Sequence, residues 1–285
     1  MNVTSPMRKR EWRRCGGQAI PHVPAQKLAS PVDLFSSPLF VLMAIVAVSL
    51  LGISKGGFFG LGVMAVPLMS LVMHPLQASA ILLPTTVAQD VLTIWTYRRN
   101  WSASNLKVLV PSMGIGIAAG WWLAASLSAA HIRLLVGVIA ALFVLRHWLR
   151  ARLERWTPRP NTATGIVFGA LGGFTTLLAN AGGPVWQMHI LPQHLDKLTY
   201  VGTVTMLFGM SNVYKVPAFG SLGLLTFENM AVGLVLVPLA VCANYLGIWL
   251  VRRTSTETFF RIAYVLMFVI AVELIRSGLT ELLRG

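Results

Sequence analysis

The sequence has few of the residues on which catalysis, metal binding and disulfide frameworks depend. Its two cysteines, Cys15 and Cys242, lie far apart, so neither a disulfide framework nor a cysteine metal pair is indicated. The histidines have no metal-ligand spacing, and no His-Glu-x-x-His or Ser/His/Asp set is evident. We therefore expect no enzyme activity, no catalytic residue, no metal and no cofactor.

Charged residues are also scarce, at 11% of the chain, and long stretches lack them entirely. Residues 56–89 and 160–195 contain no Asp, Glu, Lys or Arg, while 55% of the chain is hydrophobic. A soluble core does not need runs of this length, whereas a membrane-spanning helix needs about 20 apolar residues. The composition predicts an all-α polytopic membrane protein that is surrounded by a lipid bilayer.

Acidic residues number nine, which leaves a formal net charge of +14. A basic balance often indicates nucleic acid binding, but here the basic residues form short clusters between apolar segments, as the positive-inside rule predicts for cytoplasmic loops. We expect no nucleic acid partner. Residues 1–36 contain a basic cluster without the apolar region that follows it in a signal peptide, and we expect a flexible extension.

Apolar segments occur in two sets of five, separated by a basic linker at 151–161. The segments are 38–53, 60–73, 76–97, 106–127 and 132–149, then 162–179, 184–191, 198–219, 227–251 and 259–278. Each set has a glycine-rich break, a short segment and then a long segment that contains an aromatic residue followed by a basic one. This pattern predicts an internal duplication, with one membrane repeat at 37–150 and a second at 162–285.

An odd number of crossings per repeat makes the two halves inverted relative to each other, which is a common plan for transporters. With the basic loops on the cytoplasmic side, both ends of the membrane region lie outside. The segments at 60–73 and 184–191 are too short to span upright, so they are expected to be half-helices or re-entrant. The fold class is thus two inverted repeats of about five helical segments, with eight to ten membrane segments and glycine-broken helices.

The first glycine-rich break, at 52–62, contains five glycines and Lys55 within sequence that is otherwise apolar enough to span a membrane. Glycine weakens a helix by about 1 kcal/mol relative to alanine, and unwound backbone at membrane depth is tolerated only inside protein or beside a water-filled cavity. Close helix packing through small residues is the alternative explanation. The second break, at 178–184, favours a substrate site, because paired breaks in the two halves are a pointer to one.

Asp90 lies in segment 76–97, on one helical face with Thr86, Thr93 and Tyr97. A polar stripe on an apolar helix faces the interior of a helix bundle, and a carboxylate within it indicates function. Asp90 is therefore a candidate for proton coupling. The alternative is a structural ion pair with Lys55.

Segment 198–219 has a corresponding stripe of Thr205, Asn212 and Lys215. Lys215 is either a counter-charge for substrate or an interfacial lysine that extends to the headgroups. Lysines, amides and the N-termini of half-helices together predict an anion site. A cation site would need several carboxylates, and only Asp90 and Glu273 lie deep in apolar sequence.

Several motifs occur in a fixed order along 38–278. They are Gly-Gly-Phe-Phe-Gly-Leu-Gly-x-x-x-x-Pro at 56–67, Ala-Gly-Gly-Pro at 181–184, Tyr-Val-Gly-Thr at 200–203 and Asn212-x-x-Lys215-x-Pro217. In these motifs the chain resembles the TauE/SafE family of sulfite and organosulfonate exporters, also called the toluene-sulfonate uptake permease group. The resemblance implies a multi-pass protein of the bacterial inner membrane that transports small sulfur-containing or carboxylate anions.

We therefore expect a secondary transporter of a small anion, sulfite or an organosulfonate, with Asp90 as the proton carrier. The alternatives are a carboxylate or sulfate carrier, a membrane-embedded enzyme, and a membrane subunit that does not transport. Candidate substrate-binding residues are Lys55, Gly56, Gly57, Thr86, Gln89, Asn180, Gly182, Gly183, Thr203, Asn212 and Lys215. The sequence indicates no particular oligomeric state.

Overall fold

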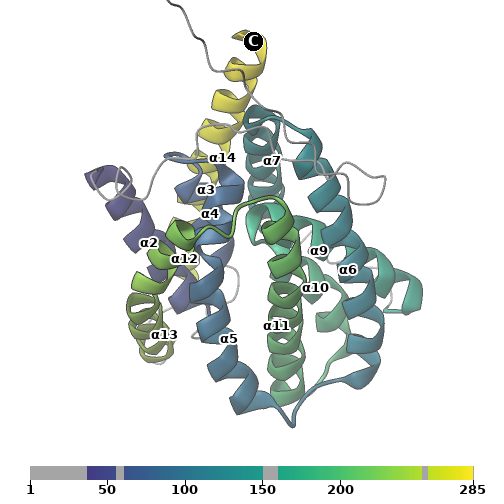
Figure 1. The fold of residues 1–285 in the computed structure, drawn as a ribbon. Coiled ribbons are helices and arrows are strands. Elements are labelled where there is room, and N and C mark those ends of the chain that lie inside the picture. Colours follow the sequence, from purple (N-terminus) through teal and green to yellow (C-terminus); the bar gives the residue numbers. More distant parts are fainter. Residues whose placement is uncertain (1–36, 56–60, 150–159, 252–255, 285) are drawn as a thin grey trace, which may run out of the picture.

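The computed structural model describes residues 37–55, 61–149, 160–251 and 256–284, and its regular structure in these ranges is entirely helical (Figure 1). This confirms the all-α prediction. The expected extension at 1–36 and nearly all of the linker at 151–161 lie outside the described residues.

Each half of the described chain is a series of long and short helices. The first half contains α2 (Pro38–Lys55), the 3₁₀ helix η1 (Leu61–Met64), α3 (Ala65–Met69), α4 (Pro75–Ile81), α5 (Leu83–Tyr97), α6 (Ala103–Ser126) and α7 (Ala129–Trp148). The second half contains α9 (Thr162–Ala179), α10 (Gly182–Ile190), the 3₁₀ helix η3 (Leu191–Gln193), α11 (Lys197–Ser221), α12 (Phe227–Val235), α13 (Val237–Val251) and α14 (Thr256–Arg284).

Among the described residues, five helical segments are long and apolar enough to cross a membrane: α2, α6, α7, α9 and the span Phe227–Gly247, which joins α12 to α13. A sixth results if α4 and α5, which are bent by 41° relative to each other, count as one span. The sequence-based number of eight to ten is larger because it also counts the short helices α3 and α10 and the long helices α11 and α14, which are not among these candidate spans. With five and nine residues, α3 and α10 are far below the length of about 20 residues that a span needs.

Polar caps mark where several helices begin. Asn161 and Thr164 form a capping box at the start of α9. His74, in the connection between α3 and α4, caps α4 by accepting a hydrogen bond at Nδ1 from the backbone N–H of Leu76. Burial, and after it the positive charge of Arg133, lowers the pKa of His74 to about 4, so the imidazole stays neutral and its nitrogen remains an acceptor.

Glycines allow two helix pairs to approach closely. A Cβ at Gly116 of α6 would overlap the carbonyl oxygen of Ala170 on α9. On the other side of the molecule, a Cβ at Gly52 of α2 would lie 2.6 Å from the carbonyl oxygen of Ala240 on α13. Gly52, at the start of the first break, therefore serves helix packing, as the small-residue alternative predicts.

Helices α9 and α10 form a helical hairpin, which we call the second hairpin. Gly165, near the start of α9, lies beside His189 at the end of α10, and Gly172 lies beside Trp186, so the two helices run antiparallel. The chain reverses at Asn180, whose φ of 54° places it in the left-handed region that asparagine tolerates better than most residues. As the length of segment 184–191 predicts, α10 folds back instead of crossing.

The first half contains a similar hairpin of α2, η1 and α3, which we call the first hairpin. Both η1 and α3 pack against α2. A Cβ at Gly62 would lie 3.2 Å from Leu51 Cδ2 and from Ser54 Oγ, both on the last turn of α2 or the turn before it. After the first break the chain therefore returns along α2.

The remaining helices surround these hairpins in a reciprocal arrangement. Helix α5 packs on α11 and α7 on α14, while α2 packs on α13 and α9 on α6. In Figure 1, α2 begins toward the upper end of the bundle and α5 meets α6 at the lower end. The second hairpin starts at that lower end, because Gln193 exchanges two hydrogen bonds of 2.8 Å with Asn105 at the start of α6. Two halves related by a pseudo-two-fold axis would produce this arrangement, and the inverted repeat itself stays a prediction.

Candidate functional site

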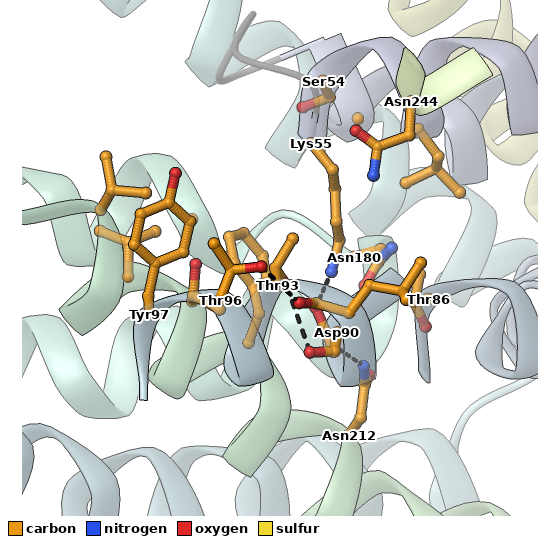
Figure 2. A pocket seen from close by; sticks show the side chains of 18 of the residues that line it. Ser54, Lys55, Thr86, Asp90, Thr93, Thr96, Tyr97, Asn180, Asn212 and Asn244 are labelled. Carbon is orange, nitrogen blue, oxygen red and sulfur yellow. Dashed lines mark hydrogen bonds and ion pairs between the residues drawn. The ribbon is translucent and has the colours of Figure 1, made fainter. Parts of the chain in front are cut away.

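A cavity of about 720 Å³ lies where the two hairpins meet α5, α11 and α13 (Figure 2). Its wall includes Lys55 and Gly62, which lie in the first break, and Asn180 and Gly183, which lie in the second break. Residues from both halves of the chain therefore line one space. The polar side chains around it include Lys55, Thr86, Asp90, Asn180, Asn212 and Asn244.

Asp90 of α5 is buried at the centre of this polar cluster, with 3% of its surface exposed. Its Oδ1 accepts a hydrogen bond from Lys55 Nζ in an ion pair, and its Oδ2 accepts one of 2.6 Å from Asn212 Nδ2. Figure 2 shows Lys55 and Asn212 approaching the carboxylate from opposite sides. Both oxygens of Asp90 thus have donors, which is the condition under which a carboxylate is tolerated in a bundle interior.

Lys215 of α11 is buried just outside the cavity wall, with 2% of its surface exposed. Its Nζ donates a hydrogen bond of 2.7 Å to Asn180 Oδ1 at the tip of the second hairpin. The amine therefore points into the protein and does not extend to the membrane surface. In the part of the chain that the structure describes, no carboxylate forms an ion pair with Lys215.

The two halves hold their hairpin tips in the same way. Lys55 ends α2 and bonds to Asp90, while Asn180 caps α9 and bonds to Lys215. Each bond joins residues that are 35 positions apart, from the end of the hairpin's first helix to α5 or α11. Asn212, three residues before Lys215 on α11, donates to Asp90 and so links the helix of the second tether to the first tether.

The electrostatics of the cluster favour an anion. Lys55 belongs to it and the buried Lys215 lies beside it, and Asp90 is the acidic side chain among the described residues that line the cavity. Gly183 and Pro184, in the first turn of α10, also line it, so the positive end of that helix's dipole faces the space. Because one carboxylate does not balance two lysines, a bound anion would complete the charge pairing.

Most of the wall away from this cluster is apolar. Phe208 of α11 lies with its ring centroid 5.1 Å from Lys55 Nζ, a cation–π contact. Leu92 and Trp95 of α5 and Val241 and Tyr245 of α13 continue the wall toward the outer face of the bundle. Within the described ranges, no three His, Cys, Asp or Glu side chains lie close enough together to hold a metal ion.

The candidate residues from the sequence fall into three groups. Those that line the cavity are Lys55, Thr86, Asp90, Asn180, Gly183 and Asn212. Those that lie outside its lining are Gln89, Gly182, Thr203 and Lys215. Gly56 and Gly57 lie outside the described residues.

The residues of the second group have contacts of their own. Gln89 Nε2 donates a hydrogen bond of 3.1 Å to the carbonyl oxygen of Ala240 and so joins α5 to α13. Thr203 Oγ1 accepts a hydrogen bond of 2.8 Å from the backbone N–H of Ser102 and joins α11 to the start of α6. Gly182 is packed so closely against Trp186 that a Cβ there would lie 2.8 Å from its ring.

Polar residues of the wall that are absent from the candidates that the sequence indicates include Ser54, Gln187 and Asn244. Asn244 is one of two asparagines in the apolar segment 227–251, and Gln187 is a polar residue in the short segment 184–191. An isolated polar residue in membrane-grade sequence is the signal that indicates such positions.

The broken helices, the lysines beside Asp90 and the cavity between the hairpin tips are typical of a polytopic membrane protein of the transporter type. The chain belongs to the sulfite exporter TauE/SafE family, whose family model matches residues 43–274 and so covers both glycine-rich breaks. This match confirms the resemblance seen in the sequence motifs, and TauE/SafE is a transporter family. No curated protein and no solved structure matches the chain.

Proposed function

We propose that the chain is a secondary transporter of the bacterial inner membrane that moves a small anion, sulfite or an organosulfonate, through the cavity between the hairpin tips. The observation that carries the proposal is that two lysines, Lys55 in the cavity wall and Lys215 buried behind it, and the N-terminus of α10 lie close to a single carboxylate. A lysine within a membrane bundle is costly unless an opposite charge or a polar partner compensates it. Only one carboxylate is present in the cavity wall that the structure describes, so an anion is the ligand that fits.

The anion would bind where Lys55, Asn180 and the first turn of α10 converge. Lys55 Nζ and the side-chain amide of Asn180 supply donors, and the N–H groups that open α10 add partial positive charge. Three donors of this kind match the oxygens of a sulfite, sulfonate or carboxylate group. The apolar wall beyond them receives whatever is attached to the acid group.

Asp90 gives this site a route to proton coupling. In the structure the carboxylate of Asp90 forms an ion pair with Lys55, so an incoming anion and Asp90 would compete for one ammonium group. Protonation of Asp90 removes that competition, because the neutral acid no longer repels the anion or retains the lysine. Anion and proton would then be carried together, and the proton would leave as Asp90 pairs with Lys55 again.

Flux measurements in proteoliposomes test the proposal. The purified protein should move at least one of sulfite, methanesulfonate, sulfate and acetate. The Lys55→Met variant should bind it roughly 10- to 150-fold more weakly, which corresponds to the roughly 1.5–3 kcal/mol of a hydrogen bond to a charged group. Lys215→Met should also bind it more weakly, because the variant loses the amine that holds Asn180 in place. Lys107→Met, an exposed lysine on α6, is the matched control and should behave like the unaltered protein.

Two results would count against the proposal in different ways. No flux of any of the four anions from correctly folded protein would indicate a subunit that does not transport. Flux with unchanged affinity in both lysine variants would keep transport but place the anion elsewhere.

A further inference from the structure

The cavity continues sideways between α5 and α13, away from the polar cluster. These two helices touch where Gln89 bonds to the carbonyl of Ala240. Beyond this contact, Leu92, Trp95 and Thr96 of α5 and Val241 and Tyr245 of α13 all line the cavity. On this side, the wall of the cavity therefore consists of side chains from the outer edges of α5 and α13.

Three of these side chains are exposed on the surface of the bundle. Trp95 is 71% exposed, Tyr245 is 67% exposed and Leu92 is 48% exposed. Tyr245 lies within the membrane-spanning segment Phe227–Gly247, and α5 forms the second part of the bent span with α4. The guanidinium of Arg98 lies 4.0 Å from the centroid of the Trp95 ring, an arrangement typical of the boundary between headgroups and acyl chains. The opening therefore faces the lipid leaflet close to this boundary.

The dimensions of the cavity exceed what a bare inorganic anion fills. A volume of about 720 Å³ falls in the range of roughly 300–1,000 Å³ that holds ligands much larger than sulfite. The charged donors are confined to the end near Lys55 and Asn180, and the far end is formed by aromatic and aliphatic side chains. A ligand that is acidic at one end and apolar at the other matches this distribution.

We propose that the opening between α5 and α13 is a subsite for the hydrocarbon chain of an amphiphilic anion that enters from the lipid leaflet. The acid group lies at Lys55 and Asn180, and the chain lies between Leu92, Trp95 and Tyr245. This inference rests on the proposed function, because it uses the same anion-binding end of the cavity. It adds that the length of the apolar chain decides affinity.

The size of the effect follows from the burial of methylene groups. Each methylene that leaves water for an apolar wall gains about 0.8 kcal/mol, which is about fourfold in affinity. The gain should continue for several carbons and stop once the chain reaches the open bilayer.

The experiment uses the full protein in nanodiscs, with labelled octane-1-sulfonate as the bound probe and empty nanodiscs to correct for partitioning into lipid. Methane-, butane-, hexane- and octane-1-sulfonate compete for the site. Their potency should rise about fourfold per methylene. In Trp95→Ala and Tyr245→Ala this dependence on chain length should flatten, and in Lys55→Met all four potencies should fall together while the dependence remains.

Trp122→Ala is the matched control, because Trp122 is 64% exposed on α6 and does not line the cavity. Trp95 and Tyr245 are both exposed, so truncating either side chain leaves the fold intact. Potencies that do not depend on chain length, or a dependence that Trp95→Ala, Tyr245→Ala and Trp122→Ala all leave unchanged, overturn the inference. Retention of a two-chain phospholipid in the opening, seen by native mass spectrometry together with a flat series, overturns it as well.

The two proposals fail separately. Flux of methanesulfonate in proteoliposomes with a flat chain-length series rejects the lipid-facing subsite and keeps the anion transporter. A steep series without flux of any anion rejects transport and keeps the subsite.

Discussion

Replacing Asp90 by asparagine separates proton coupling from structural ion pairing, because the two roles predict different losses. Asparagine keeps the shape of the side chain and one carbonyl acceptor but cannot be charged. It removes the carboxylate that pairs with Lys55 and accepts the 2.6 Å hydrogen bond from Asn212. The exposed side-chain fractions are 4% for Asp90 and 13% for Lys55, so solvent compensates little of the change.

The structural cost comes from the lysine that is left behind. An unpaired charge in a buried pair costs about 3–5 kcal/mol. Asp90→Asn should therefore unfold at a lower temperature than the unaltered protein. Adding Lys55→Met removes the orphaned charge, so the double variant should regain most of the lost stability. The change in the double variant minus the sum of the changes in the two single variants measures the coupling of the pair.

The functional effect has the opposite sign for binding. Without the competing carboxylate, Lys55 is free for the anion, so Asp90→Asn should bind the anion at least as tightly as the unaltered protein. Exchange across liposomes should continue but no longer respond to an imposed pH gradient. Glu273→Gln is the matched control, since this carboxylate pairs with Arg276 on α14 and its side chain is 45% exposed.

One result would refute the reasoning about coupling. If Asp90→Asn retains its response to the pH gradient, measured per folded molecule, Asp90 is a structural partner of Lys55 and the proton follows another path. Thermal unfolding and flux must be measured on the same preparation, because loss of folded protein alone would imitate loss of transport.

Three further predictions concern stability and the hairpin tip. The pKa of His74 in the folded protein, about 4, lies below its ordinary value of 6.5, so its contribution to stability is complete above pH 6.5 and is lost as the pH falls toward 4. Asparagine can still cap α4, so His74→Asn should flatten this decline when thermal unfolding is measured against pH. Gly116→Ala forces α6 away from Ala170 and should cost roughly 1–3 kcal/mol in unfolding free energy. Gly220→Ala should not destabilise the protein, because the nearest atom to its added Cβ is 3.9 Å away, and equal effects of the two variants would contradict the packing argument. Asn180→Gly should lower anion affinity without a backbone penalty, while Asn180→Ala should also lose about 1–2 kcal/mol of stability at its left-handed φ, and identical melting temperatures would reject that strain.

The sequence by itself determines the class of the protein and much of one wall of the cavity. Charge-free runs and hydropathy are local properties, so they identify a helical membrane protein without any tertiary contact. Helical periodicity is local too, and the face of Thr86, Asp90, Thr93 and Tyr97 that it predicts on α5 is the face that lines the cavity. Because charges are scarce in the apolar segments, the sequence also indicates two alternatives for Asp90: it carries a proton, or it forms an ion pair with Lys55.

The tertiary structure decided which polar groups meet. Gln89 lies one position from Asp90 but faces α13, and Thr203 fastens α11 to the start of α6. Asn212 becomes a donor to Asp90, and Lys215 is held by Asn180 behind the cavity wall. These partners lie on different helices, so their contacts depend on how the helix faces pack together, and that packing depends on close approaches such as the one at Gly116, which no local pattern encodes.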